Sequence, residues 1–290
     1  MGSEMCIRDR NIYDIAKLAN VSIATVSRVV NNSPKVSPKT KEKVLAVMKE
    51  NQYTPNAFAR GLGLGSMKTV GIICPNIDDI YMAKAVSYLE QNLHAHGYDC
   101  ILGCSGFKQE EKEDYVRLLL SKKIDTLILV GSTYAGNGKD ESDTDYIREA
   151  AEQVSIFMIN AKVSGDNIYC TYADDFQATY EVTKAFIRRG KEKILFMYDS
   201  ESYSARQKMA GYEAALQDAG YPIRGNLKFK TKNDIEYTRD MLLEYNRTLD
   251  FDSVLATEDG IAIGAVKYAK IKGLAIPEAV SYTHLTLPTT

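Results

Sequence analysis

From Thr69 onward, short apolar runs alternate with amphipathic helical patterns, and this alternation constrains the fold more than any other feature of the chain. The apolar runs predict buried strands at Val70–Cys74, Cys100–Gly103, Thr126–Val130, Val154–Ile159, Ile168–Tyr172, Lys193–Tyr198, Leu227–Lys230 and Ser253–Ala256. The stretches between them predict helices at Tyr81–His94, Gln109–Ser121, Asp145–Gln153, Phe176–Arg189, Ser204–Ala219, Ile235–Asn246 and Gly260–Ile271. Repeated strand–helix units form parallel sheets with helices on both faces. A crossing near Lys162–Asn167 separates two such blocks, which predicts two lobes with a cleft between them.

The segment before this alternation has a different pattern, that of three short helices over residues 11–53. In the first helix, Ile12, Ile15, Ala16 and Ala19 share one face. Ser22 can cap a second helix over Ile23–Asn31. Ser37 followed by Pro38 can open a third that ends near Asn51. A further helical pattern runs from Pro55 to Leu62, where nearby glycines make it marginal alone.

The charge is distributed unevenly along the chain. The whole sequence has a net charge of -2, yet residues 11–66 contain eight lysines and arginines and three acids, a net charge of +5. A basic head on an acidic body is compatible with a nucleic-acid partner for the head alone. No run of about 18 apolar residues predicts a membrane span, and no signal peptide opens the chain, so we expect a cytoplasmic protein.

Both ends of the chain differ from the sequence between them. The first ten residues lack periodicity, and the last ten alternate threonine and leucine before a proline. We interpret 1–10 as a non-native leader and 281–290 as a non-native tail, with a disordered native tail at each end as the alternative.

The first two helices fit a helix-turn-helix, in which a short second helix enters the major groove of DNA. The outward positions of that helix are Ile23, Ala24, Thr25, Ser27 and Arg28. Arginine can pair with guanine through two hydrogen bonds, and small apolar side chains can contact a thymine methyl. The residues alone leave open a plain three-helix bundle with a solvated basic face.

The stretch from Ile12 to Leu62 resembles the head of the lactose-repressor/galactose-repressor family of bacterial transcription regulators. The resemblance is carried by Ala16, Val21-Ser22, Thr25-Val26-Ser27-Arg28-Val29 and Tyr53-x-Pro55-Asn56. It continues to about Pro277 as a core like that of periplasmic binding proteins, through Gly71–Pro75, Gly97-Tyr98 and Ala205–Tyr212. It therefore implies an α plus α/β architecture, with a helix-turn-helix head, a hinge helix and a core of two parallel-sheet lobes.

The resemblance also implies roles for residues of the head. Ile23, Ala24 and Arg28 match the family's base-reading positions. Other positions match residues that contact DNA, mostly at phosphates: Tyr13, Ser22, Thr25, Ser27, Asn31, Ser37 and Thr40. In the hinge helix, Asn56, Ala59 and Leu62 match DNA-contacting positions, and Leu62 matches the leucine that the family wedges into the minor groove at a central CG step. A core leucine that joins head to body is the alternative for Leu62.

In the body, the resemblance implies an effector site between the lobes. The matching positions are Asp78, Asp79, Tyr81, Ser105, Asn160, Asp174, Lys208, Glu258 and Asp259. Several depart from the family's usual choices: Asp79 and Glu258 replace asparagine, Asn160 replaces aspartate, and Lys208 replaces an arginine that clamps the ligand. Lysine lacks the planar fork of arginine, so the usual sugar contacts do not carry over. Because four of the matching positions are acids that converge on one crevice, Asp78, Asp79, Asp174 and Glu258, we expect a polyhydroxylated or cationic effector.

We accordingly predict a non-enzymatic transcription regulator, in most family members a repressor, whose affinity for a pseudo-palindromic operator changes when a small molecule, such as a sugar, binds the core. Two alternatives remain: a global catabolite-control regulator with a phosphorylated carrier protein as corepressor, and a sugar-binding protein without a role in regulation. We expect double-stranded DNA, the effector and a second copy of the chain as partners, and neither a cofactor nor a metal ion. The five cysteines form no CxxC pair, and a glycine pair at Gly131 and Gly136 lacks the lysine of a phosphate loop.

The predicted boundaries follow from these patterns. They place the DNA-binding domain at 11–54, the hinge at 55–66, the first lobe at 67–163 and the second lobe at 164–280. We expect the second lobe to be incomplete, because the family's next strand would begin near Leu274.

Overall fold

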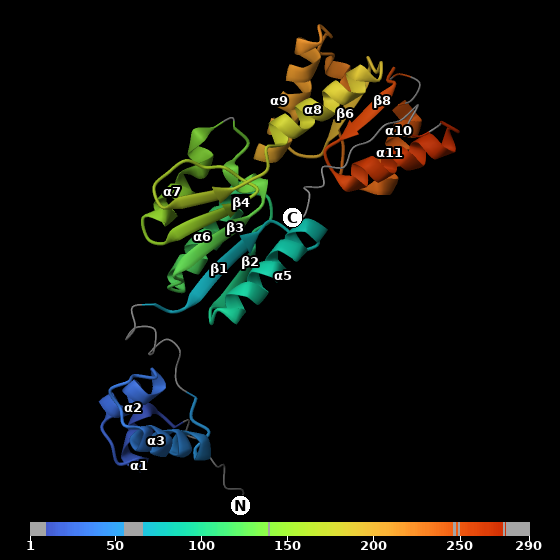
Figure 1. Cartoon of the computed structure of the whole chain (residues 1–290). Coiled ribbons are helices and arrows are strands. Elements are labelled where there is room, and N and C mark those ends of the chain that lie inside the picture. The colour runs from blue at the N-terminus through green and yellow to red at the C-terminus, as the bar shows by residue number, and fades with distance from the viewer. Residues whose placement is uncertain are drawn as a thin grey trace, which may run out of the picture.

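The computed structural model describes residues 10–54, 66–138, 140–245, 248, 250–274 and 276. These residues form a helical head and two α/β lobes, coloured blue, cyan to green, and yellow to red in Figure 1. The predicted leader, apart from Arg10, the tail and all but Ser66 of the predicted hinge lie outside the described residues.

The head consists of α1 (Ile12–Leu18), α2 (Ile23–Val30) and α3 (Pro38–Glu50), as the sequence predicts. Each helix is preceded by an N-cap residue whose side chain accepts a backbone N–H of the first turn; these residues are Asn11, Ser22 and Ser37. Such caps satisfy donors that the first turn of a helix leaves unpaired. The apolar faces of the three helices meet in one small core of Ile15, Ala16, Ala19, Val26, Val29, Val44 and Met48.

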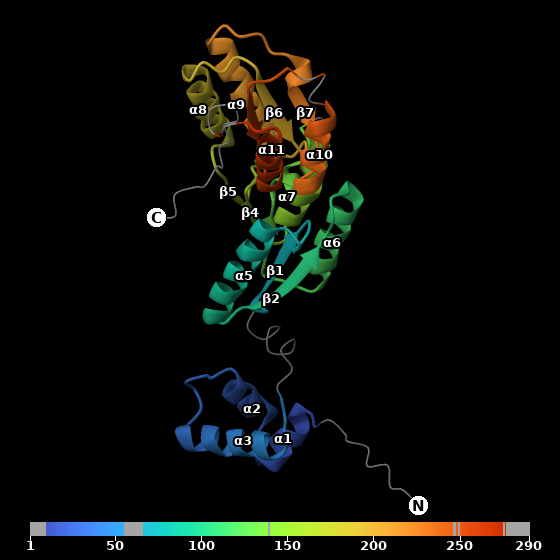
Figure 2. The same cartoon turned by 90° about the vertical axis from the view of Figure 1, so that its right-hand side faces the viewer.

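The first lobe is built on a five-stranded parallel sheet in the order β2-β1-β3-β4-β5. Its strands are β1 (Thr69–Cys74), β2 (Asp99–Cys104), β3 (Thr126–Val130), β4 (Ser155–Ile159) and β5 (Ile168–Thr171). Helix α5 (Ile80–Ala95) packs on one face, while α6 (Gln109–Ser121) and α7 (Asp145–Ala151) pack on the other. Figure 2 shows α5 and α6 on opposite sides of β1 and β2. Two short 3-10 helices, η1 (Ser132–Ala135) and η2 (Glu141–Thr144), lie between β3 and α7.

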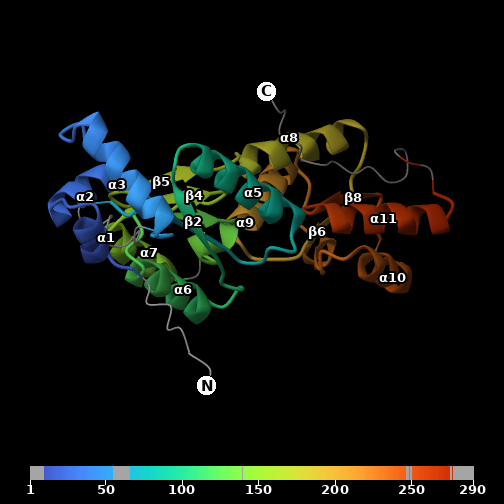
Figure 3. The same cartoon turned by 90° about the horizontal axis from the view of Figure 1, so that it is seen from below.

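The second lobe repeats this plan on a three-stranded parallel sheet in the order β7-β6-β8. Its strands are β6 (Ile194–Tyr198), β7 (Lys228–Lys230) and β8 (Ser253–Ala256). One face carries α8 (Asp175–Arg188) and α9 (Tyr203–Asp218), and the other carries α10 (Ile235–Tyr245) and α11 (Asp259–Ile271). A 3-10 turn, η3 (Gly225–Leu227), precedes β7. Figure 3 shows α8 and α10 on opposite sides of β6.

The structure corrects the predicted boundary between the lobes. The strand at 168–171 was expected in the second lobe, after a crossing near Lys162–Asn167. It pairs instead with β4 as the edge strand of the first sheet, with Ile156 opposite Ile168. The backbone N–H of Ile156 also donates to the carbonyl of Asn167 at 3.0 Å, so the polar loop returns the chain to the same sheet. The boundary therefore lies after Thr171 rather than between residues 163 and 164.

Within the part of the chain that the structure describes, no helix is both long enough and apolar enough to cross a bilayer.

Candidate functional site

Helix α2 presents its predicted base-reading residues on the outside of the head. Ile23 is 41% exposed, and Ala24 and Arg28 are also exposed. Val26 and Val29, on the opposite face, are buried in the head core. The exposed side of this short helix thus offers an apolar side chain and a cation, which fits a helix that contacts DNA in the major groove.

The N-termini of α2 and α3 are built alike. The Ser22 hydroxyl accepts the N–H of Thr25 at 3.1 Å and lies 2.9 Å from the Thr25 hydroxyl. Ser37 and Thr40 repeat this arrangement at α3, with their hydroxyls 2.8 Å apart. Exposed backbone N–H groups and hydroxyls at a helix N-terminus suit phosphate oxygens. Four predicted phosphate-contacting residues thus lie at two such helix ends.

The remaining predicted contacts of the head differ in their surroundings. Tyr13 is exposed on α1. The side-chain oxygen of Asn31, which ends α2, is buried without a hydrogen-bond partner. The predicted hinge contacts Asn56, Ala59 and Leu62 lie outside the described residues.

The effector positions predicted in the body come from loops that follow strands, or from the starts of helices, in both lobes. In Figure 1, the arrowheads of the first sheet and of β8 point toward the opposite lobe. Asp79 caps α5 through the N–H of Met82 at 2.9 Å, and Asp174 caps α8 through the N–H of Gln177 at 2.9 Å. Ligands in α/β folds bind at the carboxyl ends of strands, so these positions are suitably placed.

Lys208 and Glu258 form an ion pair within the second lobe. The Lys208 ammonium lies 3.6 Å from a Glu258 carboxylate oxygen, and it donates to the carbonyl of Thr257 at 3.0 Å. Its side chain is only 13% exposed. A lysine held in this way is fixed in place, although it lacks the two-pronged donor of an arginine.

The Glu258 carboxyl has the most perturbed acidity among the predicted effector residues. Burial raises its pKa to about 7, and Lys208 opposes that rise. The charges of Asp199, Asp79 and Asp259 raise the pKa further. Because Asp79 belongs to the first lobe, the two lobes approach closely enough here for their charges to interact.

Asp175 is a site residue that the sequence interpretation missed. It is 8% exposed, and this burial raises the pKa of its carboxyl. A hydrogen bond from the Ser204 hydroxyl and the charge of Lys208 act against the rise. The sequence carries no signal for this burial, because Asp175 becomes enclosed only when α9 packs against α8.

Tyr81 connects the two lobes electrostatically. Burial raises the pKa of its phenol, and the charges of Asp175 and Asp79 raise it further. Asp175 belongs to the second lobe and Asp79 to the first. We refer to Asp79, Tyr81, Asp175, Lys208 and Glu258 as the interlobe cluster. Acids outnumber the one lysine in it, and it offers oxygen acceptors and one cation to a small polar ligand.

Arg206 is a second residue that sequence interpretation missed, and it links the lobes directly. Its guanidinium donates to the carbonyl of Gly136 at 3.2 Å and to that of Glu201 at 3.3 Å. A Cβ at Gly138 would lie 2.6 Å from the central carbon of this guanidinium, so a side chain there would displace Arg206. The bond to Gly136 holds the loop after η1 against the start of α9.

Ser105 and Asn160 make contacts within the first lobe. The Ser105 hydroxyl lies 2.7 Å from that of Tyr134 and donates to the carbonyl of Gly106 at 3.1 Å. Asn160 has a positive φ of 61° and donates its N–H to the carbonyl of Thr171 at 2.7 Å. Asp78 and Asp259 are exposed. The structure therefore brings four of the nine predicted effector residues into the charge network, namely Asp79, Tyr81, Lys208 and Glu258, and leaves the others at its margin.

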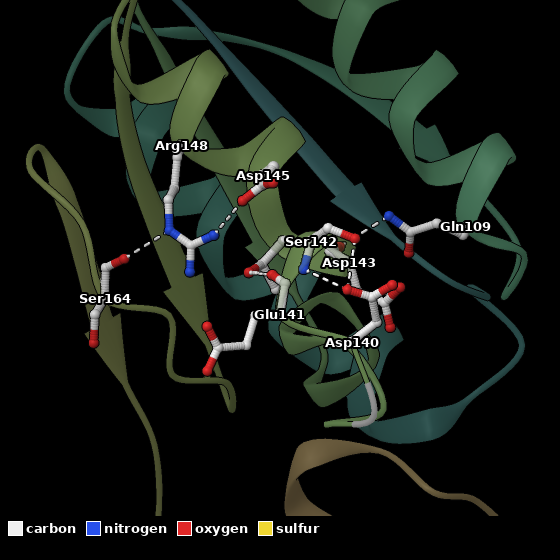
Figure 4. Close-up of polar contacts among 9 residues, drawn as sticks. Gln109, Asp140, Glu141, Ser142, Asp143, Asp145, Arg148 and Ser164 are labelled. Carbon is white, nitrogen blue, oxygen red and sulfur yellow. Dashed lines mark hydrogen bonds and ion pairs between the residues drawn. The ribbon is translucent and has the colours of Figure 1, made fainter.

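The loop after Gly131 does not have the character of a phosphate site. It continues into an acidic segment that Figure 4 shows in detail. Asp140 accepts the backbone N–H of Ser142 at 2.9 Å and its hydroxyl at 2.7 Å. Arg148 pairs with Asp145 at 2.7 Å and donates to the carbonyl of Ser164 at 3.2 Å. These carboxylates would repel a phosphate, and their bonds instead stabilise the loop.

Among the described residues, no group of three or more histidine, cysteine, aspartate or glutamate side chains is placed to hold a metal ion.

Comparison with known families matches almost the whole chain. Residues 11–56 match the model for bacterial regulatory proteins of the lacI family. Residues 67–287 match the model for periplasmic binding proteins and the sugar binding domain of the LacI family.

Similar proteins and structures agree with these matches. An HTH-type transcriptional regulator of Lachnoclostridium phytofermentans is 47% identical over 272 residues, which cover 93% of this chain and 81% of the relative. Catabolite control protein A of Priestia megaterium is 30% identical over 289 residues, with 96% and 83% covered. The lac repressor dimer bound to operator and the anti-inducer ONPF has the same fold, with a TM-score of 0.81, 22% identity, and 95% and 82% covered. The chain belongs to the LacI family of bacterial regulatory proteins.

Proposed function

We propose that this protein is a cytoplasmic, non-enzymatic repressor that binds a pseudo-palindromic operator as a homodimer and responds to a small effector bound between its lobes. The proposal rests on the outward face of α2, where Ile23, Ala24 and Arg28 are exposed. Val26 and Val29, on the inward face, are buried. Family membership supports the regulatory role.

In this proposal α2 lies in the major groove. Ile23 and Ala24 contact base edges and thymine methyls, and Arg28 pairs with a guanine. The hydroxyls at the starts of α2 and α3, together with Tyr13 and Asn31, contact phosphates. Asn56, Ala59 and Leu62 contact the minor groove at the centre of the operator, where an apolar side chain can open a base step.

Binding of the full chain to DNA tests this proposal directly. Fluorescence anisotropy would compare a pseudo-palindromic duplex that has a central CG step with a scrambled duplex, at low and moderate salt. We expect preference for the palindrome, and we expect Arg28→Ala to remove about 1–3 kcal/mol of that preference.

Lys49→Ala is the matched control, because Lys49 is an exposed cation of the head outside the proposed contact set. It should lower affinity for both duplexes equally and leave the preference unchanged. Equal affinity for both duplexes, with Arg28→Ala no worse than Lys49→Ala, would contradict the proposal. Weak pairing of two heads could also give equal affinity for both duplexes. Repeating the assay with the heads fused to a foreign dimerisation domain excludes that cause.

The interlobe cluster supports a polyhydroxylated or cationic effector. Asp79, Asp175 and Glu258 supply oxygen acceptors, while Lys208 supplies the one cation of the cluster. Effector binding would favour one of two lobe arrangements and so change the spacing of the hinge helices. Calorimetry with neutral sugars, amino sugars and sugar phosphates tests this, with Lys228→Ala as the control for Lys208→Ala. Tight binding of a sugar phosphate that Lys208→Ala does not weaken would contradict it.

One observation favours a second candidate function. The 30% identity to catabolite control protein A spans nearly the whole chain, so this protein could use a phosphorylated carrier protein as corepressor. Increased operator affinity on addition of such a carrier, only in its phosphorylated form, would favour this candidate over a local sugar-pathway regulator.

A further inference from the structure

Two cysteines end neighbouring strands of the first lobe at the same level. Cys74 is the last residue of β1, Cys104 is the last residue of β2, and the two are register partners in the parallel ladder. Neighbouring strands lie about 4.8 Å apart. Cα atoms joined by a disulfide are usually roughly 4.4–6.8 Å apart. The backbone thus already holds Cys74 and Cys104 at a separation that a disulfide can span.

The two side chains also face the same side of the sheet. Residues that are partners in a parallel ladder project to the same face, and here the thiols of Cys74 and Cys104 share a hydrogen bond. Burial, together with Cys104, raises the pKa of the Cys74 thiol to about 12. Both thiols also act on the phenol of Tyr134, whose pKa is raised mainly by burial.

The two thiols differ in their access to solvent. Cys74 is 0% exposed, whereas Cys104 lies on the edge strand β2 and is exposed. A reagent in solution can therefore reach Cys104 first, whereas Cys74 is packed in the hydrophobic core beneath α5. This is the arrangement of an attacking cysteine and a resolving cysteine.

The other cysteines in the described part of the chain have different neighbours. Cys100 lies on the same strand as Cys104, but its register partner is Val70. Cys170 lies on β5, and its thiol donates to the carbonyl of Val163 at 3.4 Å. In the register of the sheets, only Cys74 and Cys104 of these four described cysteines stand opposite each other.

We propose that Cys74 and Cys104 form a reversible intramolecular disulfide when the protein meets a peroxide. The Cys104 thiolate attacks one peroxide oxygen, the O–O bond breaks, and the departing hydroxide takes up a proton to become water. The sulfur of Cys74 then loses its proton and attacks the sulfur of the Cys104 sulfenic acid. The S–S bond forms as the S–O bond breaks, and a second water leaves. Two thiols are oxidised by two electrons and one peroxide is reduced to two waters.

A disulfide at this position would join the starts of two loops. The N–H of Ser105 donates to the carbonyl of Cys74 at 3.0 Å, and that of Gly106 donates to Pro75 at 2.9 Å. The loop after Cys74 ends at Asp79, the N-cap of α5, and Tyr81 lies in the first turn of that helix, so both belong to the segment that follows the proposed disulfide. Oxidation would therefore alter the first-lobe side of the effector region. This consequence rests on the proposed function, whereas the disulfide itself does not.

Peptide mapping of the full chain tests the disulfide alone. The reduced protein is treated with hydrogen peroxide, its remaining thiols are blocked under denaturing conditions, and it is digested with trypsin. Cleavage at lysines places Cys74 in peptide 69–84 and both Cys100 and Cys104 in peptide 85–108. We expect these two peptides to be linked, with the loss of two hydrogens, and to separate again after treatment with dithiothreitol.

Matched variants identify the bridging cysteine of the second peptide. The link should persist in Cys100→Ser and be lost in Cys104→Ser, both of which change a cysteine of β2 outside the buried core. The proposal is overturned if peroxide leaves Cys74 free and converts Cys104 only to its sulfinic acid, or if non-reducing electrophoresis shows that the Cys104 bond joins two chains. It is also overturned if the link persists in Cys104→Ser.

Discussion

The head and the interlobe cluster hold their functional side chains in opposite ways. The head presents Ile23, Ala24 and Arg28 to solvent from one short helix. The interlobe cluster gathers half-buried and buried groups from loops and helices of two lobes, and its carboxyls have raised pKa values at Asp175 and Glu258. A surface that meets a large, rigid partner can be built locally. A site for a small ligand needs enclosure, and enclosure requires contacts between distant segments.

The same contrast applies to stability. The head relies on one small core formed by three helices. Each lobe has two cores, one on each face of its sheet. Because small units bury a smaller fraction of their surface, we expect the head to be the less stable body and to unfold separately.

The largest effect is expected from Ile15→Ala, which tests this separation. Ile15 is fully buried at the centre of the head core. Removing its side chain should cost about 2–5 kcal/mol, which is comparable with the whole stability of a unit of this size. Hydrogen exchange followed by mass spectrometry should lose protection over 12–50 and keep it over 69–271.

Leu18→Ala on the same helix is the matched control, because Leu18 is exposed. It should change stability by no more than about 0.5 kcal/mol. Simultaneous loss of protection in the two lobes of Ile15→Ala would show that head and body unfold together. It would contradict the expectation that the head is a separate, less stable body.

Gly211→Ala should have the next largest effect, confined to the second lobe. A Cβ at Gly211 would lie 2.2 Å from the carbonyl oxygen of Phe176, a backbone atom of α8 that cannot move without shifting the helix. Overpacking of this kind costs about 1–3 kcal/mol. Since α8 and α9 carry Asp175 and Lys208, the change should also weaken effector binding while operator binding by reduced, ligand-free protein is retained.

Gly225→Ala provides the comparison for that variant, because a Cβ at Gly225 would meet nothing within 4 Å. Its midpoint in urea should match that of the wild type. An equal loss of stability in both variants would mean that added side-chain volume is not the cause, and that the close contact of α8 with α9 is unimportant.

The elements themselves were predictable because their signals are local. Strands such as Thr126–Val130 and Ser253–Ala256 and helix Gln109–Ser121 begin and end at the predicted residues. Apolar periodicity and capping residues determine these boundaries, and neither depends on distant contacts. The assignment of β5 to the second lobe was wrong, because pairing with β4 is a long-range property that a short, half-buried strand does not reveal.

The candidate sites show the same limit. The outward face of α2 follows from helical spacing alone, so Ile23, Ala24 and Arg28 could be placed on it from the sequence. Asp175 and Arg206 could not, because the burial of Asp175 depends on α9 and the partner of Arg206 is a carbonyl 70 residues away. Lys208 was identified only through family resemblance, and its contact with Glu258 required the structure.

The smallest predicted effect concerns pH, and it separates the interlobe cluster from the head. Burial raises the pKa of Glu258 from 4.5 to about 7 in the folded protein. The folded state therefore holds the proton more tightly than the unfolded chain does, so the contribution of Glu258 to stability is greatest below pH 4.5 and declines until about pH 7. Glu258→Gln removes this decline. The variant should gain stability relative to the wild type as pH rises from 5 to 7, by on the order of 1 kcal/mol because solvent reaches part of the carboxyl.

Thermal unfolding of the lobes at several pH values measures this difference. Glu149→Gln, which changes an exposed glutamate of α7, should follow the wild-type curve at every pH. The transition of the head should be the same in all three proteins, because Glu258 belongs to the second lobe. If the unfolding temperatures of the lobes in Glu258→Gln and in the wild type differ by the same amount at pH 5 and at pH 7.5, the carboxyl is not titrating in this range. Water would then reach the Glu258 carboxyl more freely than its burial indicates, and the interlobe cluster would be less enclosed, and so less different from the open face of α2, than we infer.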